Sequence, residues 1–209
     1  MDSTKPQLRV SVFSDYICPF CYIGSRRLLH LNDSYDVLVN WCSVEIHPDT
    51  PPAGMSVDAL GYPPAQWQAM MHALQQMAAE EGIVLAERMF TTNSHQALLL
   101  AEAAKTAGRE LFYALHERLF SAFFVDAENI GDETVLRRLA AEVGMDGDLV
   151  AAAWQDPRFE HNLTHYLRLA QSAQVHGTPT YVFGDELVRG AVGVDVLRAA
   201  AARLAAQTT

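Results

Sequence analysis

Cys18 and Cys21 are the residues of this sequence whose type and spacing most directly suggest chemistry. Only Pro19 and Phe20 separate them, and the pair lies where an apolar run over 8–13 gives way to a helical pattern. A cysteine just before a helix faces unpaired backbone N–H groups and the positive end of the helix dipole, which favour the reactive thiolate. A second cysteine one turn into the helix can resolve a mixed disulfide. The spacing therefore predicts dithiol–disulfide exchange with Cys18 as nucleophile.

A zinc site is the main alternative for this cysteine pair. A structural zinc ion needs four protein ligands, and Cys42 and eight histidines supply further candidates. The sequence has no second Cys-x-x-Cys pair and no Cys-x-x-His pair to complete such a site. His161 and His165 share one face of an expected helix, but no acidic third ligand accompanies them, so a solvated face is favoured. We therefore expect no bound metal.

Composition limits the classes of partner and compartment. The formal net charge is −10 at pH 7, which argues against non-specific nucleic-acid binding, because that binding needs basic surfaces to displace counterions from phosphates. No apolar run reaches the roughly 18 residues that span a bilayer, and the first residues lack the apolar core of a secretory signal. Three cysteines are too few, and odd in number, for a disulfide-stapled secreted scaffold. We therefore expect a cytoplasmic protein without a nucleic-acid or membrane partner.

Hydrophobic periodicity predicts an α/β fold in which two β-containing segments flank a long helical block. Apolar runs over 8–13 and 37–46, with a helical pattern from 19 to about 32 between them, indicate a βαβ unit with parallel strands. Two further strands, 180–183 and 186–189, are joined by a two-residue turn, and a last helix follows over 194–206. Helices are expected within 67–78, 94–107, 111–123, 132–144 and 157–174. We predict one domain formed by 1–62 and 175–209, interrupted by an all-helical insertion over 63–174.

The segment just before the third strand carries a second signal. It is the run from His176 through Gly177, Thr178 and Pro179. This placement resembles the thioredoxin superfamily, in which a proline here is cis and packs opposite the cysteine pair. The resemblance implies that the backbone of Thr178 pairs with an extended substrate beside Cys18. A trans proline that merely starts a strand is the alternative.

A longer stretch narrows the resemblance. The run Ser14-Asp15-Tyr16-Ile17-Cys18-Pro19-Phe20-Cys21-Tyr22-Ile23-Gly24, the helical insertion and Gly177-Thr178-Pro179-Thr180 look like the DsbA-like group. Within that group the sequence most resembles FrnE-like oxidoreductases, which are similar to 2-hydroxychromene-2-carboxylate isomerases and kappa-class glutathione transferases. The resemblance covers nearly the whole chain. It implies a thioredoxin fold for the two β-containing segments.

The resemblance implies a protein disulfide oxidoreductase without a bound cofactor, acting on a protein or small-molecule disulfide or thiol. The alternative is a glutathione-dependent isomerase or transferase with a small aromatic or polyketide-like substrate. Those relatives typically carry serine in place of Cys18, so the two cysteines favour exchange. A redox-sensing or scaffold protein that uses the fold only for binding is a third hypothesis. The sequence leaves the physiological substrate, the electron donor, the direction of electron flow and the oligomeric state open.

Two departures from the family pattern predict a mild redox centre. DsbA itself has a histidine at the third motif position, where this chain has Phe20, which cannot stabilise a thiolate. Cys18 should therefore be less acidic and the protein less oxidising. Many thioredoxins bury an acid six residues before the first cysteine, and here that position is Val12. The proton of Cys21 would then leave to water or to the substrate. The second, C-terminal Cys-x-x-Cys of some FrnE-like proteins is missing from this sequence.

Other polar residues have a functional and a structural interpretation. In the family, a pair such as Asn93 and Ser94 lies near the cleft and can touch glutathione; the alternative is an ordinary helix cap. His176 either flanks the cleft and tunes Cys18 or is an exposed loop histidine. Cys42 is expected to be a buried structural thiol, with a third redox partner as the alternative. The candidate substrate-binding residues are therefore Thr178, Pro179, Phe20, Pro19, Asn93 and His176.

Overall fold

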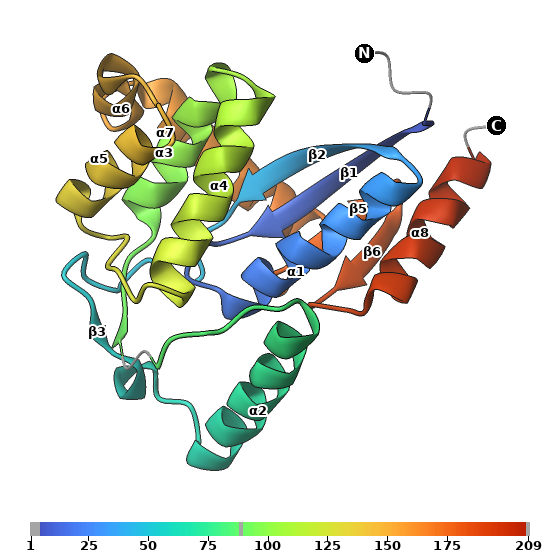
Figure 1. Ribbon diagram of the computed structural model, residues 1–209, viewed down its shortest axis with the longest axis horizontal. Helices are drawn as coiled ribbons and strands as arrows, with labels where there is room; N and C mark the ends of the chain where they lie inside the picture. The colour runs from blue at the N-terminus through green and yellow to red at the C-terminus, as the bar shows by residue number, and fades with distance from the viewer. Residues whose placement is uncertain (1–4, 88–89, 208–209) are drawn as a thin grey trace.

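A four-stranded sheet brings together strands from the N-terminal and the C-terminal parts of the chain (Figure 1). The computed structural model describes residues 5–87 and 90–207. Its strand order is β2-β1-β5-β6, with β1 Gln7–Ser14, β2 Asp36–Ser43, β5 Thr180–Phe183 and β6 Glu186–Arg189. β1 pairs parallel with β2 and antiparallel with β5. The predicted α/β class and parallel strand pair are confirmed.

Two helices cover one face of this sheet, and a third covers the other. In Figure 1, α1 (Pro19–Leu29) and α8 (Val194–Gln207) lie in front, and α7 (Pro157–Ser172) lies behind. Successive strand residues point to opposite faces. Val12 and its register partner Trp41 therefore face the α1 side, whereas Phe13 and its partner Cys42 pack against Ala170 of α7. Position along β1 and β2 thus decides which helices a residue meets.

The helical block lies beside the sheet, and the buried residues of α3 and α4 continue the core of the sheet into it. Its helices are α2 (Pro64–Glu80), α3 (His95–Thr106), α4 (Arg109–Phe124), α5 (Glu133–Glu142) and α6 (Gly147–Ala153). Eight residues of α3 and eight of α4 are buried, so these two helices are the centre of the block. Among the residues that the structure describes, no helix is both long and apolar enough to cross a membrane.

The structure differs from the sequence-based boundaries at four places. The first helix ends at Leu29 and continues as a 3₁₀ turn, η1 (His30–Asp33). β2 stops at Ser43 instead of residue 46, because the N–H of Ile46 donates to the side chain of Asp15 and leaves the ladder. Helix α6 was not expected; Asp146 caps it, and its seven residues are too few for a periodic signal. The expected loop over 48–64 contains β3 (Met55–Ser56) and η2 (Val57–Leu60). β3 pairs with β4 (Phe90–Thr91), which lies within 63–174, so this segment is not all-helical as predicted.

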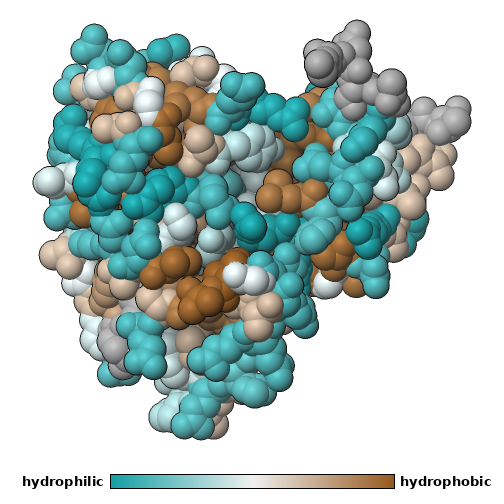
Figure 2. All heavy atoms as spheres, in the orientation of Figure 1, coloured by the Kyte–Doolittle hydropathy of each residue, from teal (hydrophilic) through white to brown (hydrophobic). Residues whose placement is uncertain are grey.

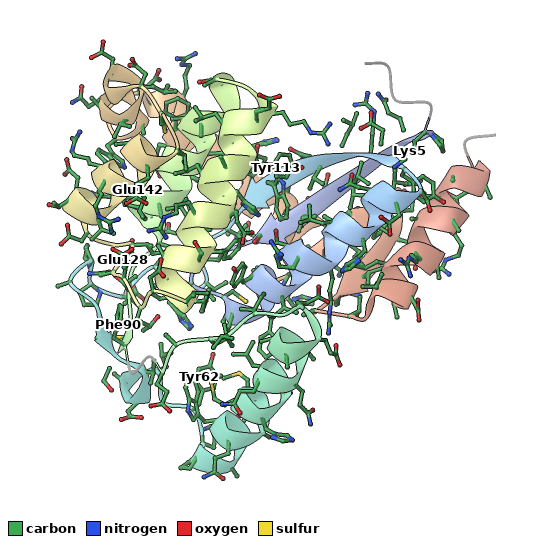
Figure 3. The ribbon with its side chains drawn as sticks, viewed as in Figure 1. Lys5, Tyr62, Phe90, Tyr113, Glu128 and Glu142 are labelled. Carbon is green, nitrogen blue, oxygen red and sulfur yellow. The ribbon has the colours of Figure 1, made fainter. Side chains whose placement is uncertain are left out.

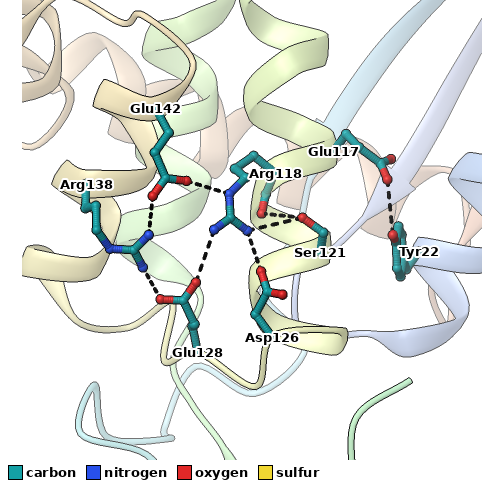
Figure 4. Close-up of polar contacts among 8 residues, drawn as sticks. All are labelled: Tyr22, Glu117, Arg118, Ser121, Asp126, Glu128, Arg138 and Glu142. Atoms are coloured by element: carbon teal, nitrogen blue, oxygen red, sulfur yellow. Dashed lines mark hydrogen bonds and ion pairs between the residues drawn. The ribbon is translucent and has the colours of Figure 1, made fainter. Parts of the chain in front are cut away.

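A cluster of ion pairs fastens α5 to the C-terminal part of α4. Figure 4 shows Arg118 of α4 at its centre, paired with Asp126, Glu128 and Glu142 at 2.7, 3.2 and 2.7 Å. Arg138 of α5 closes the cluster by pairing with Glu128 and Glu142. Single exposed ion pairs contribute little to stability, but a network of several charges holds its geometry better. The cluster therefore fixes the loop between the two helices.

A buried cation helps to attach helix α2 to the rest of the molecule. Arg27 of α1 is 3% exposed, and its guanidinium donates to the carboxylates of Glu80 and Glu81 at the end of α2. The same group donates to the carbonyls of Ala191 and Val192, which precede α8. A buried charge needs such a full set of partners. Arg27 therefore ties α2 and the β6–α8 connection to the helix that carries the cysteines.

The outer edge of β2 is closed by two cations from the helical block. In β2 the odd-numbered residues present their backbone groups outward, since Asp36 and Val44 donate to the β1 side. Arg109 donates to the carbonyl of Val37 at 2.9 Å, and Lys105 donates to that of Trp41 at 2.6 Å. A hollow of about 310 Å³ between this edge and α4 is lined by residues that include Tyr113, seen between α4 and β2 in Figure 3.

Candidate active site

The two cysteines lie where β1 ends and α1 begins. Cys18 is the N-cap of α1, with extended backbone angles, and Pro19 occupies the first helical turn. The N–H of Cys21 donates to the carbonyl of Cys18 at 3.0 Å, which brings both side chains to the same end of the helix. Cys18 is 5% and Cys21 1% exposed. This is the strand–cysteine–helix order that the sequence predicts.

The two thiols differ in acidity although both are buried. A hydrogen bond from the Cys21 side chain is the largest influence on Cys18 and lowers its pKa, with further help from Thr178 and from the backbone N–H of Cys21. Burial opposes this shift without reversing it. Burial and the neighbouring Cys18 raise the pKa of Cys21 well above its usual value. The pair therefore has one thiol suited to ionise and one suited to hold its proton.

The loop before β5 faces this pair. The Thr178–Pro179 peptide bond is cis, as the superfamily resemblance implies. The Cys18 thiol lies 3.5 Å from the carbonyl oxygen of Thr178 and can donate to it. Helix α1 approaches this loop closely because residue 24 is glycine: a Cβ there would come within 2.1 Å of the Tyr181 hydroxyl and 3.0 Å of Pro179. The residue types at 24 and 179 thus set the distance between the cysteines and the loop.

A buried acid, Asp15, completes the site, and the sequence analysis missed it. Val12 indeed lies at the position where many thioredoxins carry an acid, but Asp15, three residues before Cys18, is 1% exposed. Its carboxylate accepts the N–H of Ile17 at 3.2 Å and of Ile46 at 2.8 Å. Burial nevertheless raises the pKa of Asp15 to about 6. Position 12 carries no acid, as the sequence shows, and a buried acid comes instead from position 15; the route of the Cys21 proton stays a prediction.

Comparisons with known proteins agree with this geometry. A family model described as a DsbA-like thioredoxin domain matches residues 9–202. The chain belongs to the DsbA-like thioredoxin family. Its sequence is 29% identical over 196 residues to the uncharacterised protein YwbO of Bacillus subtilis, covering 92% of this chain and 95% of YwbO.

Two solved structures show the same fold. A probable DsbA oxidoreductase from Streptomyces coelicolor, SCO1869, superposes with a TM-score of 0.85 at 25% identity, covering 97% of this chain and 92% of that one. The cytosolic disulfide reductase DsbM of Pseudomonas aeruginosa, solved with GSH, gives a TM-score of 0.70 at 17% identity over 96% of this chain and 99% of that one. The DsbA-like fold therefore extends over the helical insertion as well as the sheet.

The remaining predicted site residues of this DsbA-like chain lie in different surroundings. Pro19 and Phe20 are half-buried at the start of α1. The side chain of Asn93 accepts the N–H of His95 at 2.8 Å and donates to the carbonyl of Pro48 at 2.9 Å, so it supports the start of α3, whose N-cap is Ser94. His176 is exposed. The assignment of these residues to substrate binding stays a prediction.

Apolar side chains lie beside the cysteine end of α1. Partly buried residues pack around a cluster that includes Ile23 and Leu74, and they join α1 to α2 and the segment after it; they are Phe20, Met71, Met77, Ile83 and Leu85. Figure 2 shows apolar side chains gathered on the visible face above α2. Val84 in the same segment is 82% exposed. The surface next to Cys18 is thus more apolar than the acidic composition of the chain suggests.

Proposed function

We propose that this protein is a thiol–disulfide oxidoreductase that uses Cys18-Pro19-Phe20-Cys21 for dithiol–disulfide exchange. The observation that carries the proposal is the asymmetry of the cysteine pair at the N-terminus of α1. The pKa of Cys18 is lowered by its hydrogen bonds, and that of Cys21 is raised by burial. An attacking thiol must be ionised, and a resolving thiol should stay protonated until the mixed disulfide has formed. Membership of the DsbA-like family supports the same reaction class.

The reaction follows from the two roles. The Cys18 thiolate attacks one sulfur of a substrate disulfide, forms a mixed disulfide and releases the other substrate sulfur as a thiolate. Cys21 then loses its proton and attacks the Cys18 sulfur, which releases the second substrate thiolate and leaves a Cys18–Cys21 disulfide. The substrate gains two electrons and the cysteine pair loses two. The backbone of Thr178, beside Cys18, would pair with an extended substrate, and Pro179, Phe20 and Pro19 would form the walls around it.

Glutathione is the co-substrate that we propose for returning the pair to its reduced form, in the cytoplasm. Two glutathione molecules can reduce the Cys18–Cys21 disulfide through a second mixed disulfide, giving oxidised glutathione and two thiols. The structural likeness to a cytosolic disulfide reductase solved with GSH supports this choice. Asn93 and His176 would lie at the outer part of such a binding site. No bound cofactor is needed for this cycle.

Catalysed reduction of a model protein disulfide by dithiothreitol tests the proposal. The wild-type protein should accelerate the reduction, and Cys18→Ser should remove that acceleration to about a thousandth or less of the wild-type rate, because serine cannot exchange disulfides. Cys42→Ser is the matched control, because it removes a buried thiol on the opposite face of the sheet, and it should keep the wild-type rate. Absence of catalysis by the wild type would contradict the proposal. Saturable glutathione binding that survives Cys21→Ala, together with that absence, would instead favour the isomerase or transferase.

A further inference from the structure

We propose that the carboxylate of Asp15 is a positioning residue that opposes the thiolate of Cys18 and so biases the Cys18–Cys21 pair towards acting as a reductant. This deepens the proposed function and rests on it.

The position of Asp15 is the first part of the argument. It follows β1 directly, and its carbonyl accepts the N–H of Cys18 at 3.2 Å. Its carboxylate accepts the N–H of Ile17 and, across the sheet end, that of Ile46. The side chain is thus held by two backbone N–H groups, one from its own loop and one from the segment after β2, while its carbonyl holds the N–H of Cys18. A carboxylate in this place cannot move away from the redox centre without breaking them.

The partners of Asp15 are too few to cancel its charge. The hydroxyl of Ser94, the N-cap of α3, makes no hydrogen bond of ordinary geometry in this structure but lies close enough to lower the pKa of Asp15. The charge of Glu45 raises that pKa. His95, which pairs with Glu45 at 3.0 Å, offsets the Glu45 charge in part when protonated. The largest influences on the pKa of Asp15 are burial, hydrogen bonds and the charge of Glu45, with no cation among them, so an ionised Asp15 adds negative charge that opposes a thiolate at Cys18.

Electrostatic coupling between Asp15 and Cys18 works in both directions. The charge of Asp15 raises the pKa of Cys18 against the hydrogen bonds that lower it, and a thiolate at Cys18 must likewise disfavour ionisation of Asp15. Burial places the pKa of Asp15 at about 6, so the carboxylate becomes charged just below neutral pH. The opposition is therefore present at neutral pH and absent in mild acid, where Asp15 is protonated. The other groups near Asp15 that can titrate are Tyr16, Glu45 and His95.

The sign of the redox effect follows from the half-reaction. Reduction of the Cys18–Cys21 disulfide takes up two electrons and yields Cys18 as thiol or thiolate and Cys21 as thiol. A group that stabilises the thiolate stabilises the reduced form and makes the pair a stronger oxidant. The charge of Asp15 acts in the opposite sense and stabilises the disulfide relative to the dithiol. The charge of Asp15 and the phenylalanine at position 20, in place of a histidine, thus both make the Cys18–Cys21 disulfide a weaker oxidant.

Titration of Cys18 in the wild type and in Asp15→Asn tests the inference. Alkylation of the reduced protein is followed against pH by mass spectrometry at the level of single cysteines. In Asp15→Asn the alkylation midpoint of Cys18 should fall, giving about three to ten times more thiolate at a pH below it. Equilibration with a glutathione redox buffer should show the variant disulfide reduced about three to ten times more readily. Asp49→Asn, at an exposed loop position, is the control and should change neither quantity.

Two further observations keep the inference falsifiable. In the wild type the Cys18 reactivity should show a second inflection near the pKa of Asp15, about 6, and this needs no variant. A folded Asp15→Asn protein with an unchanged Cys18 midpoint and redox equilibrium, or a wild type without the inflection, would overturn the proposal. If the titration shifts but the wild type catalyses no disulfide reduction, the proposed function fails while the role of Asp15 stands.

Discussion

The start of α1 and the C-terminal part of β2 each bury a thiol, and the pKa values of the two thiols are shifted in opposite directions. At the end of β1, the pKa of Cys18 is lowered by hydrogen bonds from Cys21 and Thr178. In β2, burial raises the pKa of Cys42 to about 11, with only partial relief from the charge of Lys105. Both side chains are almost inaccessible, with 5% and 1% exposure. Burial alone therefore does not set the pKa of these thiols: several hydrogen bonds lower that of Cys18, whereas one neutral donor, Asn40, reaches the sulfur of Cys42.

The places of the two thiols, one at the start of a helix and one inside a strand, explain this difference in pKa. Cys18 is the N-cap of a helix, where the backbone N–H groups of the first turn point towards it, and that of Cys21 helps to lower its pKa. Cys42 is inside a strand, where its own backbone is in the ladder and its side chain meets Phe13, Val44 and Ala170, with the neutral amide of Asn40 donating to its sulfur at 3.4 Å. The strand thus gives Cys42 mainly apolar neighbours and one neutral donor, whereas the helix start gives Cys18 several hydrogen bonds that favour its thiolate. We therefore expect the two thiols to differ in their rate of alkylation, in their effect on the redox equilibrium and in their contribution to stability.

Alkylation rates should separate the two sites most strongly. Cys42, with its pKa raised from 9.0 to about 11, carries about a hundred times less thiolate at neutral pH than an ordinary thiol, and Cys18 carries more. Timed reaction of the reduced native protein with iodoacetamide, mapped by mass spectrometry, should show Cys18 reacting at least about a hundredfold faster. Unfolding in urea should bring the two rates together. Similar rates in the native protein would contradict the comparison.

A positive charge placed beside Cys18 should enlarge the difference in pKa between Cys18 and Cys42. In Phe20→His the imidazolium would lie next to the thiolate, so the pKa of Cys18 should fall by about one unit or more, a tenfold gain in thiolate at lower pH. The glutathione redox equilibrium should move with it towards a stronger oxidant. Phe20→Leu removes the ring without adding charge and is the matched control. If both variants shift the equilibrium equally, the effect comes from packing and not from charge.

Removal of the Cys42 thiol should have the smallest effect, and on stability alone. Cys42→Ala leaves a small gap among Phe13, Val44 and Ala170, so the free energy of unfolding should fall by about 1 kcal/mol. Urea denaturation followed by circular dichroism measures that loss, and the rate of disulfide reduction should stay at the wild-type level. Loss of catalysis in a fully folded Cys42→Ala protein would restore the alternative of a third redox partner.

The sequence predicted the sheet of this protein better than the surroundings of its cysteines. The strands 180–183 and 186–189 and the start of α1 at Pro19 match the structure to the residue, because turn and proline signals are local. The end of β2 was placed too late, because what ends it is a contact of Ile46 with Asp15, thirty-one residues apart. Helix α6 escaped notice because it is shorter than two periods of the apolar pattern.

Contacts between segments distant in the chain also limited the prediction of the candidate site. The roles assigned to Cys18 and Cys21 followed from a spacing of three residues and from the helix that begins between them. Asp15 was overlooked because an acid next to a strand looks like an ordinary exposed loop residue until Ile46 and Ser94 are folded over it. The spacing of Asp15 before Cys18 was the available signal, but burial depends on segments distant in the chain. Helix α3, part of the insertion, thus contributes to the environment of the redox centre.

The closed edge of β2 has a consequence for how this protein behaves at high concentration. Strands at the margin of a sheet are the places where identical chains join to form continuous ladders and, eventually, insoluble material. A second copy that approached β2 would have to displace Arg109 and Lys105 from the carbonyls of Val37 and Trp41. Each cation would then lose its carbonyl acceptor and keep its acid partner, Asp36 for Arg109 and Glu102 for Lys105. The two side chains therefore disfavour self-association through this edge strand, independently of the chemistry of the cysteines.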